Sequence, residues 1–244
     1  MQQSPHLGNI KVIFFEIDNT LHDNSKGIII ALQKTFHQFK KQLTPITETK
    51  FLRAHHKLEK QLIKAYWKNK LHDPITLEDT SRFQMLSKQL KLRNKDLVAK
   101  MAEACNRYQS ESIQLFPYVK ATLKLLKKHY QLAILSNGPS ELQRNKLRGL
   151  GLYNTFDWIL ISEDVGFDKP DVKIFQYALR ATRAKPDESV MIGNTVDTDL
   201  AAKQLGMKTI LFDPVKNYTS HEFVEFPPDA LVSSYKELQA LFLE

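Results

Sequence analysis

Cysteine is nearly absent from this chain of 244 residues, and Cys105 is the one cysteine in it. No disulfide can therefore form within the chain, and a reducing compartment is the simpler expectation. Long apolar runs are also missing, since the longest, Ile10–Phe15 (interrupted by Lys11) and Gly27–Leu32, are too short to span a bilayer. The first nine residues lack the basic-then-apolar order of a signal peptide. We therefore expect a cytoplasmic protein with no membrane partner.

Motifs for binding nucleic acid are lacking too, although the formal net charge is +8. There is no zinc-finger spacing, no aromatic motif for stacking RNA bases and no unbroken basic tail. The lysines between residues 34 and 70 recur at helix-like intervals among polar residues, which is typical of a solvated helix face. A nucleic-acid partner is therefore not favoured, and the charge is better suited to attracting small anions. The oligomeric state stays open.

The chain contains three regions of different pattern. Lys11–Phe15 is short, apolar, β-branched and aromatic, which predicts a buried strand. Residues 24–112 show apolar side chains at three- and four-residue steps, for example at Met85, Leu86 and Leu90, which predicts four or five helices. After Phe116 the pattern alternates between helices and short strands. The predicted helices are 119–129, 140–150, 172–182, 199–205 and 235–243, and the predicted strands are 131–135, 158–161, 189–192, 209–212 and 230–232.

Strands that alternate with helices over such lengths predict right-handed crossovers and a parallel sheet covered on both faces. The fold class is therefore α/β, with a Rossmann-like parallel sheet as its core. An all-helical domain, the cap, is inserted after the first strand. We expect residues 1–23 plus 113–244 to form the core and residues 24–112 to form the cap.

Polar side chains follow four of the predicted strands, where ligands bind in open α/β sheets. Glu16 and Asp18 follow the first strand, and Ser136-Asn137-Gly138 follows the second. Lys169 stands before a proline after the third strand, and the segment 193–199 (GNTVDTD) follows the fourth. Each group alone is an ordinary set of turn residues, but all four in this order are a specific signal.

This arrangement resembles the haloacid dehalogenase-like (HAD) superfamily, in particular its phosphatase branch with an inserted helical cap. The resemblance covers nearly the whole chain. It includes Leu115-Phe116-Pro117, the segment 134–138 (ILSNG), the stretch from Ile161 through Lys169-Pro170-Asp171 to Phe175, and the glycine-led motif that ends in Gly206-Met207.

The resemblance implies a role for each polar group. The catalytic residues would be Glu16 at the nucleophile position, Asp18 as general acid and base, Ser136 and Lys169. Phosphate would be bound by Thr20, Ser136, Asn137, Gly138 and Lys169, and Mg²⁺ by Glu16, Asp18, Asn194 and Asp199. The cap would close over the site and select the leaving group.

Two positions depart from the family pattern. The family nucleophile is aspartate, and this chain has Glu16, whose extra methylene shifts the carboxylate by about a bond length. A displacement of ~1 Å can lower the rate ~100-fold. The family also has an aspartate where this chain has Asn194, which can coordinate Mg²⁺ but adds no charge, although Asp197 could offset part of that loss.

Four functional hypotheses follow from these residues. The leading one is a Mg²⁺-dependent phosphatase of a small phosphorylated metabolite, such as a nucleotide or sugar phosphate, with reduced activity. The alternative is a catalytically inactive phosphate-binding or regulatory protein, because of Glu16 and Asn194. A dehalogenase is disfavoured by Asp18 and Lys169-Pro170, and nucleic-acid binding through the basic cap has no motif to support it.

Overall fold

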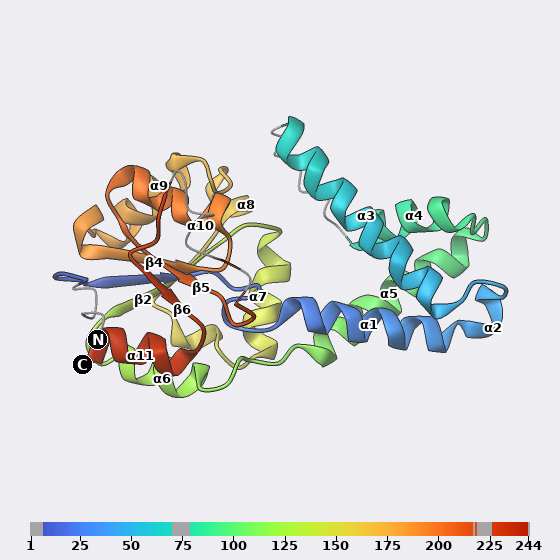
Figure 1. Ribbon diagram of the computed structural model, residues 1–244, viewed down its shortest axis with the longest axis horizontal. Coiled ribbons are helices and arrows are strands. Elements are labelled where there is room, and N and C mark those ends of the chain that lie inside the picture. The colour runs from blue at the N-terminus through green and yellow to red at the C-terminus, as the bar shows by residue number, and fades with distance from the viewer. Residues whose placement is uncertain (1–6, 70–78, 217, 219–225, 244) are drawn as a thin grey trace. The chain divides into compact units, whose positions relative to one another are not determined.

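The protein divides into two compact units, as a computed structural model shows (Figure 1). The first unit comprises Met1–Asp23 and Gln114–Glu244, and the second comprises Asn24–Ile113. The structure describes residues 7–69, 79–216, 218 and 226–243. Each unit has its own hydrophobic core.

A six-stranded sheet forms the centre of the first unit. Every neighbouring pair of strands is parallel, and the order across the sheet is β3-β2-β1-β4-β5-β6. The strands are β1 (Val12–Phe15), β2 (Gln131–Ser136), β3 (Trp158–Ile161), β4 (Ser189–Gly193), β5 (Lys208–Phe212) and β6 (Ala230–Val232). The predicted parallel sheet is therefore confirmed.

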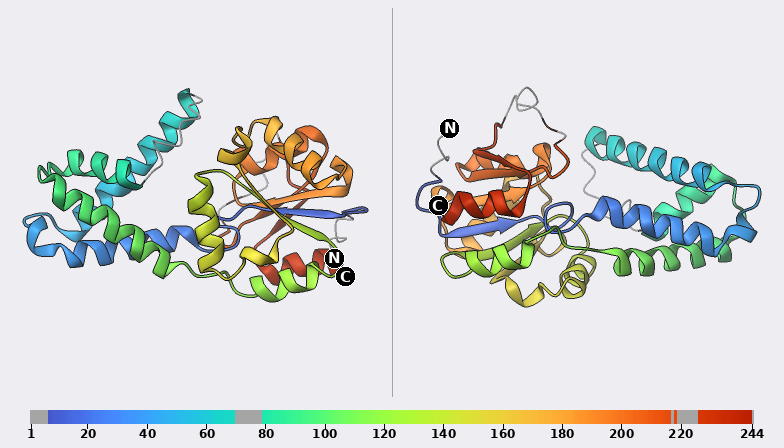
Figure 2. Two further views of the ribbon diagram at one scale, coloured as in Figure 1. Left: turned by 180° about the vertical axis from the view of Figure 1, so that it is seen from behind. Right: turned by 60° about the horizontal axis from the view of Figure 1, so that its bottom comes forward.

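Strand β1 is central, and its four residues are all buried. Its sequence, VIFF, has no polar position because helices cover both faces of a parallel sheet. Val12 and Phe14 point to one face, where they pack with residues of helix α9 (Val172–Thr182) and the 3₁₀ helix η4 (Leu200–Leu205). Helices α6 (Val119–Leu126) and α11 (Tyr235–Leu243) lie side by side on the opposite face (Figures 1 and 2).

Shorter elements complete the first unit. They are α7 (Ser140–Gly149), α8 (Ser162–Val165), α10 (Val196–Asp199) and the 3₁₀ helices η2 (Tyr153–Thr155) and η3 (Pro186–Glu188). One difference from the sequence prediction concerns residues 199–205. The single helix expected there is instead the end of α10 followed directly by η4. Short apolar patterns do not separate α from 3₁₀ geometry, which explains the difference.

The described part of the second unit is helical. Its helices are α1 (Asn24–Gln38), α2 (Lys40–Leu43), α3 (Glu48–Asn69), α4 (Asp79–Leu90) and α5 (Lys95–Ser112). Phe36, Phe51, Leu86 and Met101 are buried together at its centre. Asn94 caps α5 by accepting a hydrogen bond from the amide of Leu97.

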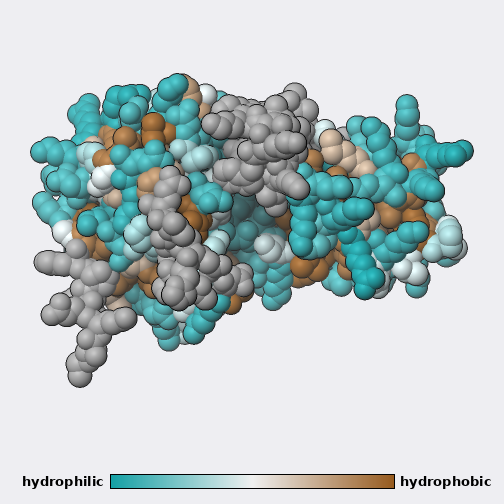
Figure 3. Space-filling view, turned by 45° about the horizontal axis from the view of Figure 1, so that its top comes forward, coloured by the Kyte–Doolittle hydropathy of each residue, from teal (hydrophilic) through white to brown (hydrophobic). Residues whose placement is uncertain are grey.

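Polar residues dominate the molecular surface that is visible in Figure 3, and the hydrophobic residues appear there in smaller patches. None of the described helices combines the length and the apolar character that crossing a membrane requires.

Tyr235 connects helix α11 to the segment that follows β1. Its side chain is fully buried, and its hydroxyl donates a hydrogen bond to the carbonyl oxygen of Thr20 at 3.0 Å. The hydroxyl of Thr122 in turn donates to the carbonyl of Tyr235 at 3.2 Å. These contacts hold the segment that carries Glu16 and Asp18 against the core.

We predict that Tyr235→Phe lowers the free energy of unfolding by about 1–3 kcal/mol, because the buried Thr20 carbonyl loses its donor. Urea unfolding followed by circular dichroism measures the change. Tyr177→Phe is the matched control, since Tyr177 is 40% exposed. Equal stability of the two variants would contradict the prediction.

Candidate active site

The candidate site lies where the carboxyl ends of β1, β2 and β4 meet. Phe15 at the end of β1 is in register with Ile134 of β2 and Ile192 of β4. The next residue, Glu16, donates its backbone amide to the carbonyl of Ile192 at 2.9 Å. The strand pairing therefore fixes Glu16 between the ends of its two neighbours.

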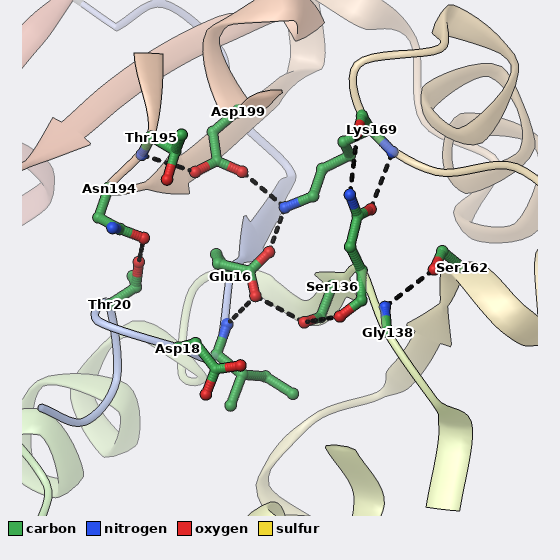
Figure 4. A network of polar contacts seen from close by, with 12 residues as sticks. Glu16, Asp18, Thr20, Ser136, Gly138, Ser162, Lys169, Asn194, Thr195 and Asp199 are labelled. Atoms are coloured by element: carbon green, nitrogen blue, oxygen red, sulfur yellow. Dashed lines mark hydrogen bonds and ion pairs between the residues drawn. The ribbon is translucent and has the colours of Figure 1, made fainter. Parts of the chain in front are cut away.

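The carboxylate of Glu16 is surrounded by hydrogen-bond donors (Figure 4). Its Oε1 accepts from the hydroxyl of Ser136 at 2.5 Å and from the backbone amide of Ile17 at 2.9 Å. Its Oε2 accepts from the ammonium of Lys169. The side chains of Glu16, Ser136 and Lys169 come from different segments of the chain. Glu16 is only 8% exposed, so the cluster is shielded from water.

Lys169 also forms an ion pair with Asp199, at 2.6 Å between Nζ and Oδ1. The second oxygen of Asp199 accepts from the backbone amide of Thr195 at 3.0 Å. Gly193 makes this position possible, because a Cβ on Gly193 would lie 2.2 Å from the Asp199 carboxyl group. Glycine is therefore required at the end of β4.

Two carboxylates share one ammonium in this buried cluster. Burial, together with the nearby charge of Asp199, raises the pKa of Glu16 above its ordinary value, although Lys169 and Ser136 act against the shift. Burial alone would lower the pKa of Lys169, but Asp199 and Glu16 outweigh it and raise that pKa. With all three groups ionised, the cluster carries one excess negative charge, which favours a cation nearby.

Asn137 and Gly138 form hydrogen bonds with the loops around the site. The side chain of Asn137 donates to the carbonyl of Lys169 at 2.9 Å and accepts from the amide of Lys169 at 2.8 Å. The amide of Gly138 donates to the hydroxyl of Ser162 at 3.0 Å. These contacts position Lys169 and the turn after β2. The expected binding of phosphate by Asn137 and Gly138 stays a prediction.

Asp18 belongs to a second cluster of polar side chains. Lys146 donates to both of its carboxylate oxygens at 2.8 Å, and His22 Nε2 lies 3.0 Å from Oδ1. Gln143 links the two clusters, because its amide donates to Asp18 at 3.2 Å and to Ser136 Oγ at 3.2 Å. Within the described residues, His22 Nδ1 and Gln143 Oε1 are buried without a hydrogen-bond partner.

Burial raises the pKa of Asp18, but the charge of Lys146 and the hydrogen bond and charge of His22 lower it more. The net direction is well below the ordinary range for aspartate, so the group is a stable anion. Its side chain is 26% exposed, and solvent therefore screens part of this effect.

Three partners of Asp18 were not predicted from the sequence, namely His22, Gln143 and Lys146. Two features of the sequence point to them. His22 follows Asp18 by four residues, and Gln143 and Lys146 share a face of the helix that begins just after the second motif.

Thr20 and Asn194 lie together at the side of the site. The hydroxyl of Thr20 donates a hydrogen bond to the side-chain oxygen of Asn194 at 3.3 Å, so Thr20 contacts the segment 193–199 that follows β4. Glu16 is bonded to Ser136 and Lys169, and Lys169 to Asp199, whereas Asp18 is joined to this cluster through Gln143. The expected phosphate role of Thr20 stays a prediction.

The donor set suits Mg²⁺ in its chemistry. Glu16, Asp199 and Asn194 offer only oxygen ligands, and the cluster around Lys169 has one excess negative charge. In the described ranges, no group of three or more His, Cys, Asp or Glu side chains is arranged to hold a metal ion. Asn194 offers an uncharged amide oxygen rather than a third carboxylate. The residues therefore fit Mg²⁺ as weak rather than strong ligands.

The parallel sheet with helices on both faces makes this an α/β protein, and a buried lysine between two carboxylates lies at the carboxyl edge of that sheet. Comparison with family models identifies the family. Residues 13–212 match the model of the haloacid dehalogenase-like hydrolases, and the chain belongs to that family.

Curated relatives span nearly the whole chain. A glyceraldehyde 3-phosphate phosphatase from Methanothermobacter thermautotrophicus is 32% identical over 221 residues, which are 88% of this chain and 91% of the relative. The human N-acylneuraminate-9-phosphatase is 26% identical over 246 residues, covering 91% and 94% of the two chains.

The fold has a close match among solved structures. The HAD-hydrolase YfnB from Bacillus subtilis, bound to magnesium, aligns with a TM-score of 0.80. The alignment covers 97% of this chain and all of that one, at 22% sequence identity. The predicted HAD-like fold is therefore confirmed.

We predict that Lys146→Met lowers the free energy of unfolding at pH 7 by about 1–3 kcal/mol, because Asp18 loses its cation. The folded pKa of Asp18 lies below its unfolded value of about 3.9. Its stabilisation is thus present above about pH 4 and is lost as the pH falls toward the folded pKa. The difference between the native protein and Lys146→Met should stay constant from pH 7 to about 5 and shrink below about 4.

Urea unfolding at each pH measures this difference. Lys124→Met, on the exposed side of α6, removes the same charge without a buried partner and should change stability little. A difference between native and Lys146→Met that grows as the pH falls would contradict the assignment.

Proposed function

We propose that the protein is a phosphatase of the haloacid dehalogenase-like family that hydrolyses the phosphomonoester of a small metabolite. The observation that carries this proposal is the contact of Glu16 with both Ser136 and Lys169 at the carboxyl edge of the sheet. A carboxylate, a hydroxyl and an ammonium in one buried cluster are the groups that phosphoryl transfer requires.

In this proposal, a carboxylate oxygen of Glu16 attacks phosphorus and forms an acyl phosphate, while the bond from phosphorus to the ester oxygen breaks and the alcohol leaves as an oxyanion that takes its proton from water. Lys169 and the hydroxyl of Ser136 stabilise the charge on the phosphoryl oxygens. Asp18 then accepts a proton from the water that hydrolyses the acyl phosphate, for which it must be an anion, although its lowered pKa makes it a weak base. Lys146 keeps Asp18 deprotonated, which disfavours Asp18 as a proton donor to the leaving oxygen. Esters whose leaving groups depart without a proton are therefore the best first substrates.

The curated relatives support the substrate class, because their names describe phosphatases of a triose phosphate and of a sugar-acid phosphate. Mg²⁺, held by Glu16, Asn194, Asp199 and the backbone of Asp18, would supply positive charge next to the phosphoryl oxygens. We also propose a cytoplasmic location, which the single buried cysteine, Cys105, supports.

We predict Mg²⁺-dependent release of phosphate from p-nitrophenyl phosphate, with slower release from glyceraldehyde 3-phosphate and sugar phosphates. Asp18→Asn should lower kcat by about 100-fold or more, because it removes the general base. A malachite-green assay in Mg²⁺ or in EDTA measures the rates. Asp187→Asn, on the exposed helix η3, is the control and should match the native protein. Absence of release from every substrate, for native and control alike, would rule out the proposal.

A second candidate function is a phosphate-binding protein without turnover. It is favoured by the length of Glu16, whose carboxylate already occupies the donors of Ser136 and Lys169. Asn194 adds to it, because an amide binds Mg²⁺ less strongly than a carboxylate.

We predict that Glu16→Asp, alone or with Asn194→Asp, raises kcat by about 100-fold, because it returns the carboxylate by ~1 Å toward the position for attack. Steady-state kinetics on p-nitrophenyl phosphate measures the gain. Glu141→Asp makes the same shortening on the exposed side of α7 and should have no effect. If the native protein already turns over as fast as Glu16→Asp, the second candidate function is excluded.

A further inference from the structure

The groups expected to bind phosphate already have a ligand. Ser136 Oγ donates to Glu16 Oε1 at 2.5 Å, and the ammonium of Lys169 donates to Glu16 Oε2. The backbone amide of Ile17 adds a third donor to Oε1 at 2.9 Å. An ammonium, a hydroxyl and a backbone amide around two negatively charged oxygens form an oxyanion-binding arrangement.

The direction of the Glu16 side chain makes this possible. It comes from the end of β1 and extends toward Ser136 and Lys169 (Figure 4). Its additional methylene, relative to aspartate, carries the carboxylate farther into this group of donors by about a bond length. A nucleophile must approach phosphorus from outside its equatorial oxygens, and here the carboxylate stands among the groups that would bind those oxygens.

We propose that the Glu16 carboxylate is an internal ligand of the phosphate-binding pocket, which competes with phosphate for Ser136 and Lys169 and thereby sets the affinity of the site. This inference rests on the proposed function only in naming phosphate as the ligand. It makes the length of side chain 16 a determinant of affinity, separate from any role of that residue in attack on phosphorus.

Burial makes this internal ligand an effective competitor. Ser136 and Lys169 are almost fully buried, so water does not replace Glu16 as their partner. The carboxylate is also covalently attached, and its effective concentration in the pocket exceeds that of a free anion. Phosphate must therefore break two charge-assisted hydrogen bonds and displace the side chain before it binds.

Charge alone offers a rival explanation, since any anion near the pocket repels phosphate. The two explanations differ for three variants. Glu16→Asp keeps the charge but withdraws from the donors, Glu16→Gln removes the charge but keeps the size, and Glu16→Ala removes both. Competition for the donors predicts tighter phosphate binding for the aspartate and alanine variants and a smaller gain for glutamine. Repulsion predicts equal gains for glutamine and alanine and none for aspartate.

Isothermal titration of inorganic phosphate into the full chain, in EDTA and again at fixed Mg²⁺, tests the proposal. We expect Glu16→Ala and Glu16→Asp to bind phosphate at least tenfold more tightly than the native protein, and Glu16→Gln less than threefold. Glu188→Ala is the matched control, because it changes the net charge by the same amount at the opposite end of the strands, where Glu188 pairs with Lys11. Its affinity should equal the native one.

Two further measurements complete the test. Adding Lys169→Met to Glu16→Ala should abolish the gain, which places phosphate in this pocket, and a gain that persists would overturn the proposal. Thermal melting checks folding, and Glu16→Asp provides a conservative variant if alanine destabilises the chain. Equal affinity of native and Glu16→Asp, or equal gains for glutamine and alanine, would also overturn it.

The proposed function and this inference can fail separately. If Glu16→Asp binds phosphate more tightly but neither it nor the native protein hydrolyses any phosphomonoester, the phosphatase proposal fails and the internal ligand stands. If both hydrolyse substrates but bind phosphate equally, the internal ligand fails and the phosphatase proposal stands.

Discussion

The buried ammonium of Lys169 is the interaction on which the site depends. Burying a charged lysine away from water costs several kcal/mol unless it is paired, and here Glu16, just after β1, and Asp199, at the end of α10, are its two partners. Loss of either would leave a buried charge partly uncompensated. The cluster therefore ties the loop after β3 to the ends of β1 and β4, and the same ion pairs that stabilise the sheet edge also assemble the candidate chemistry.

The pairing of the strands fixes the backbone at the carboxyl edge of the sheet, whereas the side-chain contacts of the site depend on small differences in side-chain size. Parallel pairing of β1 with β2 and β4 fixes backbone positions at the carboxyl edge, so substitutions of side chains there leave the framework in place. The close approach of Asp199 to Gly193 leaves no room for adjustment at the end of β4. A change of one methylene at position 16 would therefore alter the contacts of Ser136 and Lys169 rather than the pairing of the strands.

The alternation of helices and strands, the parallel sheet and the polar residues that follow four of its strands were all predicted from the sequence. Those features depend on local periodicity and on the rule that parallel strands end at one edge. The sequence could not predict which donors each side chain would use. Gln143 and Lys146 contact Asp18 because of how α7 packs on the core, and Asn137 turns toward the backbone of Lys169 because of the loop after β3. Both are tertiary effects, because spacing places Gln143 and Lys146 on one face of α7 but does not show which residue that face contacts.

Glu16 belongs to one of the two polar clusters, and Asp18 lies at the centre of the other. Asp18 keeps Lys146 and His22 as partners, and Gln143 still reaches both Asp18 and Ser136. In the proposed mechanism Asp18 handles the protons, and the two departures from the family pattern, Glu16 and Asn194, lie outside its set of partners. Gln143 joins the two clusters through Ser136, so side chain 16 is the position at which the proposed competition for Ser136 and Lys169 would act.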